Sequence, residues 1–195
     1  MKIAIISDIH ENNYNLVSFY EYIEDKNIEQ ILCLWDIMNN WVAKLLAFSW
    51  LPVHMVWGNN DWEKVAITKT SLHKNSKLTV AATSFDTIEI DNKKIFLSHY
   101  PMLAKPMAKS WDFDVVFFGH THKKMITEQR GCLIVNPWEL SAHKTWTATF
   151  AIYDTQHNSA EIINLEDFKN MKFDKVSEYR KNIWFKYSES KEHKY

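Results

Sequence analysis

The chain has 195 residues, with 23 basic and 24 acidic side chains that give a formal net charge of −1. This near-neutral balance supplies no overall field to attract nucleic acid or an anionic membrane surface, so both are unlikely partners. No stretch approaches the roughly 18 uninterrupted apolar residues of a membrane span, and the N-terminal apolar run meets Asp8 too early to be the core of a signal peptide.

The first third of the chain alternates short apolar runs with amphipathic stretches. Apolar runs that predict buried strands occupy residues 3–7, 31–34 and 53–57, and helical spacing occurs over 16–23 and 42–48. Strands that alternate with helices are typical of βαβ units, in which a parallel sheet is covered on both faces. We therefore predict an α/β fold.

The rest of the chain has more strands than helices. Strands are predicted at 78–82, 87–90, 94–98, 115–118, 124–128, 132–135, 147–153 and 161–165, and a helix at 103–109. Asp91-Asn92 and Arg130-Gly131 are expected to form tight turns. We expect one domain over residues 1–165 and a charged tail, helical or frayed, over 166–195, in a cytoplasmic protein.

Residues of the kinds that bind metals follow five of the predicted strands: Asp8 and His10, Asp36, Asn59, His99, and His120 with His122. Ligands of open α/β sheets bind outside the carboxyl ends of the strands, so these residues can converge on one site. In a strand, residues at i and i+2 point to the same side, so Asp8 and His10 can hold one cation together, as can His120 and His122.

These donors are oxygen and imidazole without thiolate, a set that suits Mn, Fe or Zn. Asp36 could bridge two cations roughly 3.5–4 Å apart. Asp8, His10 and one histidine would complete the first site, and Asn59 with two histidines the second. A water between the cations would lose a proton near neutral pH, and the resulting metal-bound hydroxide could attack a phosphate ester with no protein nucleophile.

In their order along the chain, these motifs resemble those of the calcineurin-like metallophosphoesterases, in particular the small bacterial and archaeal phosphodiesterases. The resemblance extends from Met1 to about Asp154, and it includes Gly58-Asn59-Asn60-Asp61, Gly119-His120-Thr121-His122 and Asn136-Pro137. It implies an α/β/β/α sandwich of two mixed sheets. It also implies two divalent metal ions, with Mn favoured over Fe, Zn, Ni or Mg, and a small phosphate ester as substrate.

The resemblance further implies a division of the ligands. Asp8, His10, Asp36 and His122 would hold one metal, and Asp36, Asn59, His99 and His120 the other. Asp36, Asn59, Asn60 and Asp61 are the predicted catalytic residues. Many larger relatives have a histidine that protonates the leaving group at the position of Asn60, so the resemblance supplies no general acid here.

Several residues leave alternatives open. Asp61 is predicted either to orient a metal ligand or to cap the helix that follows it. The histidines outside the motifs are expected to be surface or core residues: His54, His73, His143, His157 and His193. Cys33 and Cys132 lack CxxC spacing and are expected to be buried small hydrophobes. Four lysines near the motif loops could steer phosphate or simply be solvated: Lys105, Lys109, Lys123 and Lys124.

Glycine is scarce and tryptophan abundant, with three glycines against nine tryptophans. Related sequences commonly have glycine at Trp35, Trp62 and Trp138, and Trp111 and Trp146 occupy similar loop positions. Glycine serves where the backbone needs a positive φ or approaches a ligand, and an indole there would crowd the metal site. We hypothesise that UGA codons for glycine were translated as tryptophan. The alternative is a divergent protein that is rich in tryptophan.

The function predicted from the sequence is metal-dependent hydrolysis of a phosphate ester, by a phosphodiesterase or a phosphatase that could also form a homo-oligomer. Two alternatives are a catalytically silent scaffold of the same fold and a nuclease of the same superfamily. A scaffold has no physical reason to retain all seven ligands, and a nuclease would need a basic stripe for its many phosphate contacts.

Overall fold

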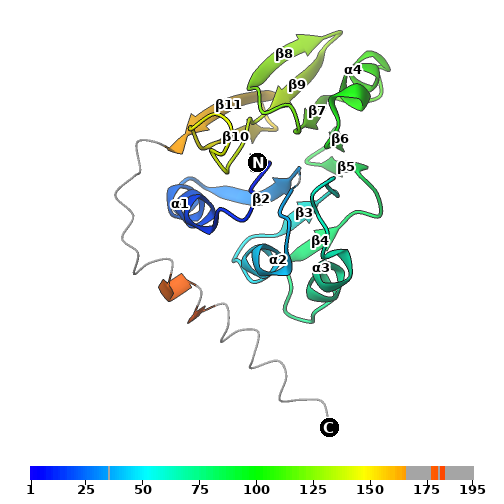
Figure 1. The fold of residues 1–195 in the computed structure, drawn as a ribbon. Helices are drawn as coiled ribbons and strands as arrows, with labels where there is room; N and C mark the ends of the chain where they lie inside the picture. The colour runs from blue at the N-terminus through cyan, green and yellow to red at the C-terminus, as the bar shows by residue number, and fades with distance from the viewer. Residues whose placement is uncertain (35, 166–176, 180, 183–195) are drawn as a thin grey trace.

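The computed structural model describes residues 1–34, 36–165, 177–179 and 181–182 (Figure 1). Its strands are β1 (Lys2–Ile6), β2 (Ile28–Cys33), β3 (Val53–Met55), β4 (Leu78–Val80), β5 (Phe85–Ile90), β6 (Lys93–Ser98), β7 (Val115–Phe118), β8 (Met125–Gln129), β9 (Cys132–Asn136), β10 (Thr149–Asp154) and β11 (Ser159–Asn164). Its helices are α1 (Asn13–Ile23), α2 (Asn40–Ala47), α3 (Lys64–Ser71) and α4 (Pro101–Lys109).

The strands form two mixed sheets. The first sheet has the order β11-β10-β1-β2-β3-β4, in which β1 to β4 are parallel while β10 pairs antiparallel with β1 and β11. The second has the order β5-β6-β7-β9-β8, with a parallel centre of β6, β7 and β9 and antiparallel strands at both edges. The last two strands therefore return to the N-terminal sheet.

Alternation along the strands creates four layers. On β1, Ile3 and Ile5 join a core that also contains Leu97 of β6 and Phe117 of β7, so this core lies between the sheets. Residues of the other parity pack outwards, because side chains of a strand alternate between faces. Ala4 and Ile6 meet α1 and α2, and Val116 and Phe118 meet α4. The predicted α/β/β/α sandwich is confirmed.

Most predicted elements are present with ends shifted by one to three residues. The exception is α3, which has two buried residues, Ile67 and Thr70, and so no apolar stripe that periodicity could detect. The turns at Asp91-Asn92 and Arg130-Gly131 are confirmed, each with positive φ at both positions. Most of the predicted tail, 166–195, lies outside the described residues; its described part, 177–179 and 181–182, is helical.

Three of the five singled-out tryptophans have a left-handed backbone, namely Trp111 (φ 70°), Trp138 (φ 80°) and Trp146 (φ 61°). This is the conformation that glycine adopts without a steric penalty. Trp62 does not share it, and Trp35 lies outside the described residues. Trp62, Trp111 and Trp146 are 65%, 70% and 82% exposed, so most of their surface is in contact with solvent.

Both cysteines are buried without a disulfide, as predicted, and they lie in the cores on opposite outer sides of the sandwich. Within the part of the chain that the structure describes, no helix combines the length and the apolar character needed to cross a bilayer.

Candidate metal centre

The predicted ligands lie in loops just past the strand ends, at the edge where parallel strands of both sheets finish. Five of them have a positive φ: Asp8 (53°), His10 (43°), Asp36 (50°), His120 (67°) and His122 (48°). Since β1 ends at Ile6 and β7 at Phe118, neither ligand pair continues its strand. The strand-like geometry expected for these pairs is therefore wrong. Asp8 and His10 still lie in one group, as expected, whereas His120 and His122 join different groups.

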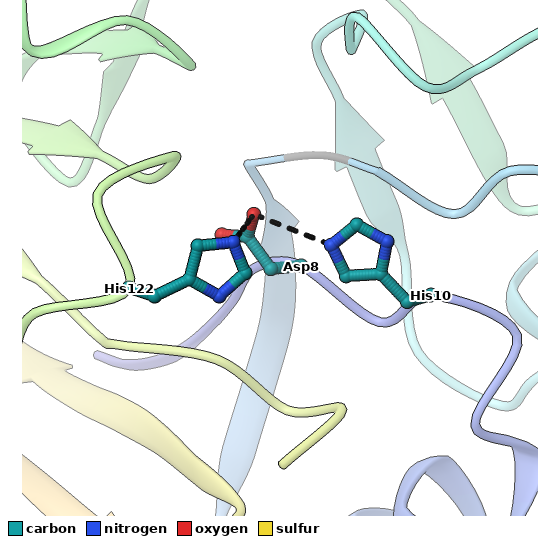
Figure 2. Close-up of side chains that lie close together, drawn as sticks. All are labelled: Asp8, His10 and His122. Carbon is teal, nitrogen blue, oxygen red and sulfur yellow. Dashed lines mark ion pairs between the residues drawn. The ribbon is translucent and has the colours of Figure 1, made fainter. Parts of the chain in front are cut away.

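The first group gathers around the carboxylate of Asp8 (Figure 2). Its Oδ1 lies 3.8 Å from His10 Nε2 and 3.4 Å from His122 Nε2, and the three donor atoms fall within 4.8 Å of one another. Asp36 Oδ2 lies 3.7 Å from His10 Nε2. Four side chains from three separate loops thus direct oxygen and nitrogen atoms at one small volume.

This group fits a cation. Asp8 Oδ1 and His10 Nε2 are buried, and neither has a hydrogen-bond partner among the described residues. Buried polar atoms without hydrogen bonds are costly, and a ligand that contacts both this carboxylate oxygen and this imidazole nitrogen would remove that cost. A divalent metal does so, and this donor chemistry suits Mn, Fe or Zn.

The second group consists of Asn59, His99 and His120. His99 Nε2 lies 2.9 Å from Asn59 Oδ1 and 2.6 Å from His120 Nδ1. Burial, with the charge of His120 adding to it, lowers the pKa of His99 to about 3 even though Asp8 opposes the shift. A neutral imidazole retains the lone pair that a metal requires. The backbone N–H of His120 also donates to Asp8 Oδ2 at 3.3 Å, which links the two groups.

Asp36 contacts the first group and the loop that carries Asn59 of the second. It contacts His10 of the first group, and it accepts two hydrogen bonds from Asn60, the neighbour of Asn59: one from the backbone N–H (3.0 Å) and one from Nδ2 (2.7 Å). Burial raises the pKa of Asp36 against the opposing effect of these hydrogen bonds. Asn60 therefore fixes the carboxylate that was predicted to bridge two metals.

Asp61 joins the loops beneath the site. Its Oδ1 accepts from Met38 N and its Oδ2 from Gly58 N, both at 2.8 Å. Burial raises its pKa to about 7, with the nearby charge of Asp36 acting in the same direction. The helix-cap alternative is wrong, since α3 follows Glu63 as its N-cap and has no side-chain capping bond.

Gly119 allows the two sheets to approach each other at the site. A Cβ at this position would lie 2.2 Å from Ser7 Oγ and 3.0 Å from Asp8 Oδ2. Ser7 Oγ in turn donates to Asp8 Oδ2 at 2.5 Å. The backbone φ of Gly119 is not in the left-handed range, so glycine is needed here for close packing and not for its conformational freedom.

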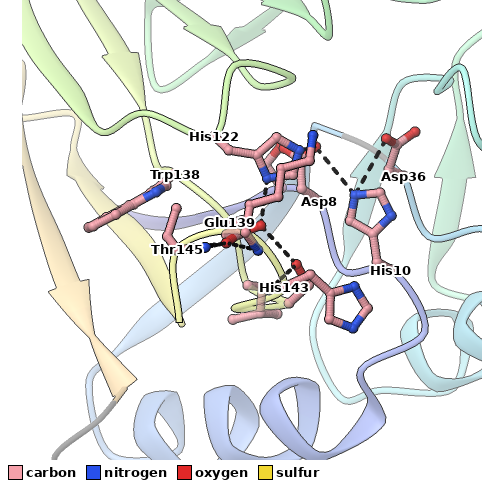
Figure 3. Close-up of polar contacts among 12 residues, drawn as sticks. Asp8, His10, Asp36, His122, Trp138, Glu139, His143 and Thr145 are labelled. Carbon is pink, nitrogen blue, oxygen red and sulfur yellow. Dashed lines mark hydrogen bonds and ion pairs between the residues drawn. The ribbon is translucent and has the colours of Figure 1, made fainter. Parts of the chain in front are cut away.

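Sequence reasoning missed two residues near the first group, Glu139 and His143 (Figure 3). Glu139 Oε2 lies 2.5 Å from His122 Nδ1, and the ring centroid of His143 lies 5.9 Å from that of His10. Glu139 follows Asn136-Pro137 by two residues, so its place after a motif was the available signal. His143 is an exposed residue, as expected, but it stands beside the site.

The remaining histidines and lysines are peripheral. His54 pairs with Asp86 at 2.9 Å, His157 with Asp154 at 2.7 Å, and His73 packs edge-on against Phe48. His193 lies outside the described residues. Each of the four lysines near the motif loops is exposed, and Lys124 stacks over the Trp138 ring at 5.3 Å.

Comparison with known proteins agrees with this geometry. Residues 1–158 match the sequence model of the calcineurin-like phosphoesterase superfamily domain. The chain is 30% identical over 168 residues to phosphodiesterase MJ0936 of Methanocaldococcus jannaschii, covering 85% of this chain and 100% of that protein.

Solved structures share the fold of this chain. An archaeal phosphodiesterase superposes with a TM-score of 0.78 at 29% identity, over 84% of this chain and 99% of that one. YfcE, a phosphoesterase from E. coli, shares the fold with a TM-score of 0.65 at 21% identity over 86% and 94%. Vps29 from Entamoeba histolytica shares it with a TM-score of 0.61 at 17% identity over 84% and 99%.

The sandwich, the two groups of donors at its strand ends and the family match over most of the chain lead to one conclusion. This chain belongs to the calcineurin-like phosphoesterase superfamily of metal-dependent hydrolases.

Proposed function

We propose that this protein hydrolyses small phosphate esters, phosphodiesters among them, with two divalent cations. The observation that carries the proposal is the pair of donor groups, with Asp36 next to His10 of the first group and hydrogen-bonded to Asn60, the neighbour of Asn59 of the second. Its relative of 30% identity is named a phosphodiesterase, which supports that ester class.

The ligands divide between the cations by group. Asp8, His10, Asp36 and His122 would hold the first, and Asp36, Asn59, His99 and His120 the second. Mn is the metal we favour for these oxygen and imidazole donors, with Fe, Zn, Ni and Mg as alternatives. When bound, such a pair supplies an activated water and neutralises charge on the phosphoryl oxygens.

The chain's own residues supply the positioning. Asn60 holds both oxygens of Asp36, so the direction of that carboxylate is set before any cation binds. Asp61 links the loop at Met38 to the loop at Gly58 by hydrogen bonds, and this link holds Asp36 and Asn59 at fixed positions relative to each other. Preorganised groups of this kind lower the barrier because they need not reorganise during the reaction.

Asn60 itself has no titratable proton. An amide cannot protonate a leaving group at neutral pH, so esters with good leaving groups are the substrates that this site should favour.

The experiment is hydrolysis of bis(4-nitrophenyl) phosphate with and without Mn²⁺. We expect turnover that depends on the metal and falls by orders of magnitude in Asp36→Asn. Asp86→Asn is the matched control, because Asp86 is a carboxylate that pairs with His54 outside the site. Absence of turnover, with no difference between these variants, would favour the scaffold alternative. Cleavage of single- or double-stranded DNA in preference to the small diester would favour a nuclease.

A further inference from the structure

Glu139 lies directly behind a predicted metal ligand. It belongs to the connection between β9 and β10, its side chain has no exposed surface, and its Oε2 is 2.5 Å from His122 Nδ1 (Figure 3). The other ring nitrogen, Nε2, faces Asp8 Oδ1 at 3.4 Å. The imidazole of His122 is therefore placed between two carboxylates, with one nitrogen for each.

Both oxygens of the Glu139 carboxylate accept hydrogen bonds. Oε1 accepts from Lys144 N (2.9 Å), Thr145 N (2.7 Å) and Thr145 Oγ1 (2.6 Å), and Oε2 accepts from Ser141 Oγ (3.1 Å) besides the histidine. Such a set of donors accounts for a buried charge that would otherwise be costly.

The same segment also holds the backbone of the site. Leu140 N donates to Ser7 O at 2.9 Å, and Ser141 N donates to Asp8 O at 3.0 Å. The segment from Glu139 to Thr145 thus contacts both the backbone of Asp8 and the side chain of His122. Trp138, the residue before this segment, lies on the far side of Glu139 from His10 and Asp36 (Figure 3).

The direction of the histidine bond follows from these contacts. An ionised carboxylate only accepts, so Nδ1 carries the proton and donates it to Glu139. Nε2 is then the ring nitrogen that can bind a cation, and it lies on the side of Asp8. In proteins, a carboxylate that accepts from the second nitrogen of a metal-binding histidine fixes its tautomer and raises its basicity.

We propose that Glu139 is a positioning residue that holds His122 as its Nδ1–H tautomer, with Nε2 aimed at the first cation. The proposal depends on the metal site proposed above. It adds a residue that touches neither cation nor substrate, and it assigns part of the metal affinity of the first site to a contact between the loop after β7 and the connection that follows β9.

The first test needs no metal and no substitution. Nitrogen-15 NMR of the metal-free protein, recorded at a pH high enough for the His122 ring to carry a single proton, should show that proton on Nδ1. In Glu139→Gln, an amide N–H₂ turned towards Nδ1 would make that nitrogen an acceptor, and the proton should move to Nε2. A wild-type ring that is protonated on Nε2 alone would overturn the proposal, whether or not the variant folds.

The second test is affinity for Mn²⁺ by calorimetry. Glu139→Gln should weaken binding at one of the two sites by about 10–100-fold. Thr145→Val is the matched control, since it removes one bond to Oε1 and leaves the His122 contact intact. Equal weakening in both variants would reduce Glu139 to a loop anchor and refute the proposal.

A double-mutant cycle completes the design. If Glu139 acts through His122, then Glu139→Gln should cause no further loss of affinity in a His122→Ala background. A full additional loss would contradict this. Failure of the proposed function would look different: the tautomer would be found as stated, but Mn²⁺ would neither bind nor support hydrolysis.

Discussion

Trp146→Gly is expected to stabilise the protein. Trp146 has φ 61° and its side chain is 82% exposed, so glycine would relieve backbone strain while little buried apolar surface is lost. A side chain other than glycine in the left-handed region costs about 1–2 kcal/mol. The greater conformational freedom of glycine in the unfolded chain lowers this gain in stability by about 0.5–1 kcal/mol. The expected net gain is therefore on the order of 0.5–1 kcal/mol.

Trp62→Gly is the matched control. Trp62 is 65% exposed, yet its φ is not positive. The unfolded-state cost of glycine applies to it without any relief of strain, so this variant should lose about 0.5–1 kcal/mol. The difference between the two variants isolates the strain, at about 1–2 kcal/mol.

Urea or thermal unfolding of both variants measures that difference, which should separate their melting temperatures by a few degrees. If Trp146→Gly destabilises the protein as much as Trp62→Gly does, the strain argument is wrong. The recoding hypothesis has its own test in the gene, because UGG codons at Trp35, Trp62 and Trp138 would exclude it.

Three further outcomes are expected. Gly119→Ala places a Cβ 2.2 Å from Ser7 Oγ, so it should lower the free energy of unfolding by ~1–3 kcal/mol and weaken Mn²⁺ affinity. An unchanged free energy of unfolding together with an unchanged affinity would contradict the packing argument. In metal-free protein, the pKa of Asp61 is raised to about 7 from 3.8, so the stability present below pH 3.8 should be lost as the pH rises through 7, by on the order of 4 kcal/mol. Denaturant titrations across this range would show a flatter profile for Asp61→Asn, and an unchanged slope would refute the assignment. Asn60→Ala removes the 2.7 Å bond to Asp36 and should lower kcat by about 10–100-fold, measured on the aryl diester, while the metal-free melting temperature stays within a few degrees. A change in KM alone would refute that role.

The order of the elements was predictable because β1, β7 and the second half of β2 are almost wholly buried, which leaves continuous apolar runs in the sequence. The weakly apolar α3 was not predictable, since its pattern carries too little signal to separate it from a loop. The pairing of β10 with β1 was not predictable either, because these two antiparallel strands are separated in sequence by most of the chain.

The seven donors and the edge at which they gather were determined by the sequence alone, since metal-type side chains follow strands whose ends must meet in an α/β sheet. Their grouping was decided by tertiary structure. Left-handed turns at His120 and His122 send neighbouring side chains to different groups, and no strand periodicity encodes that. Glu139 became part of the site only when the connection after β9 folded back against His122, because a contact between distant segments depends on packing.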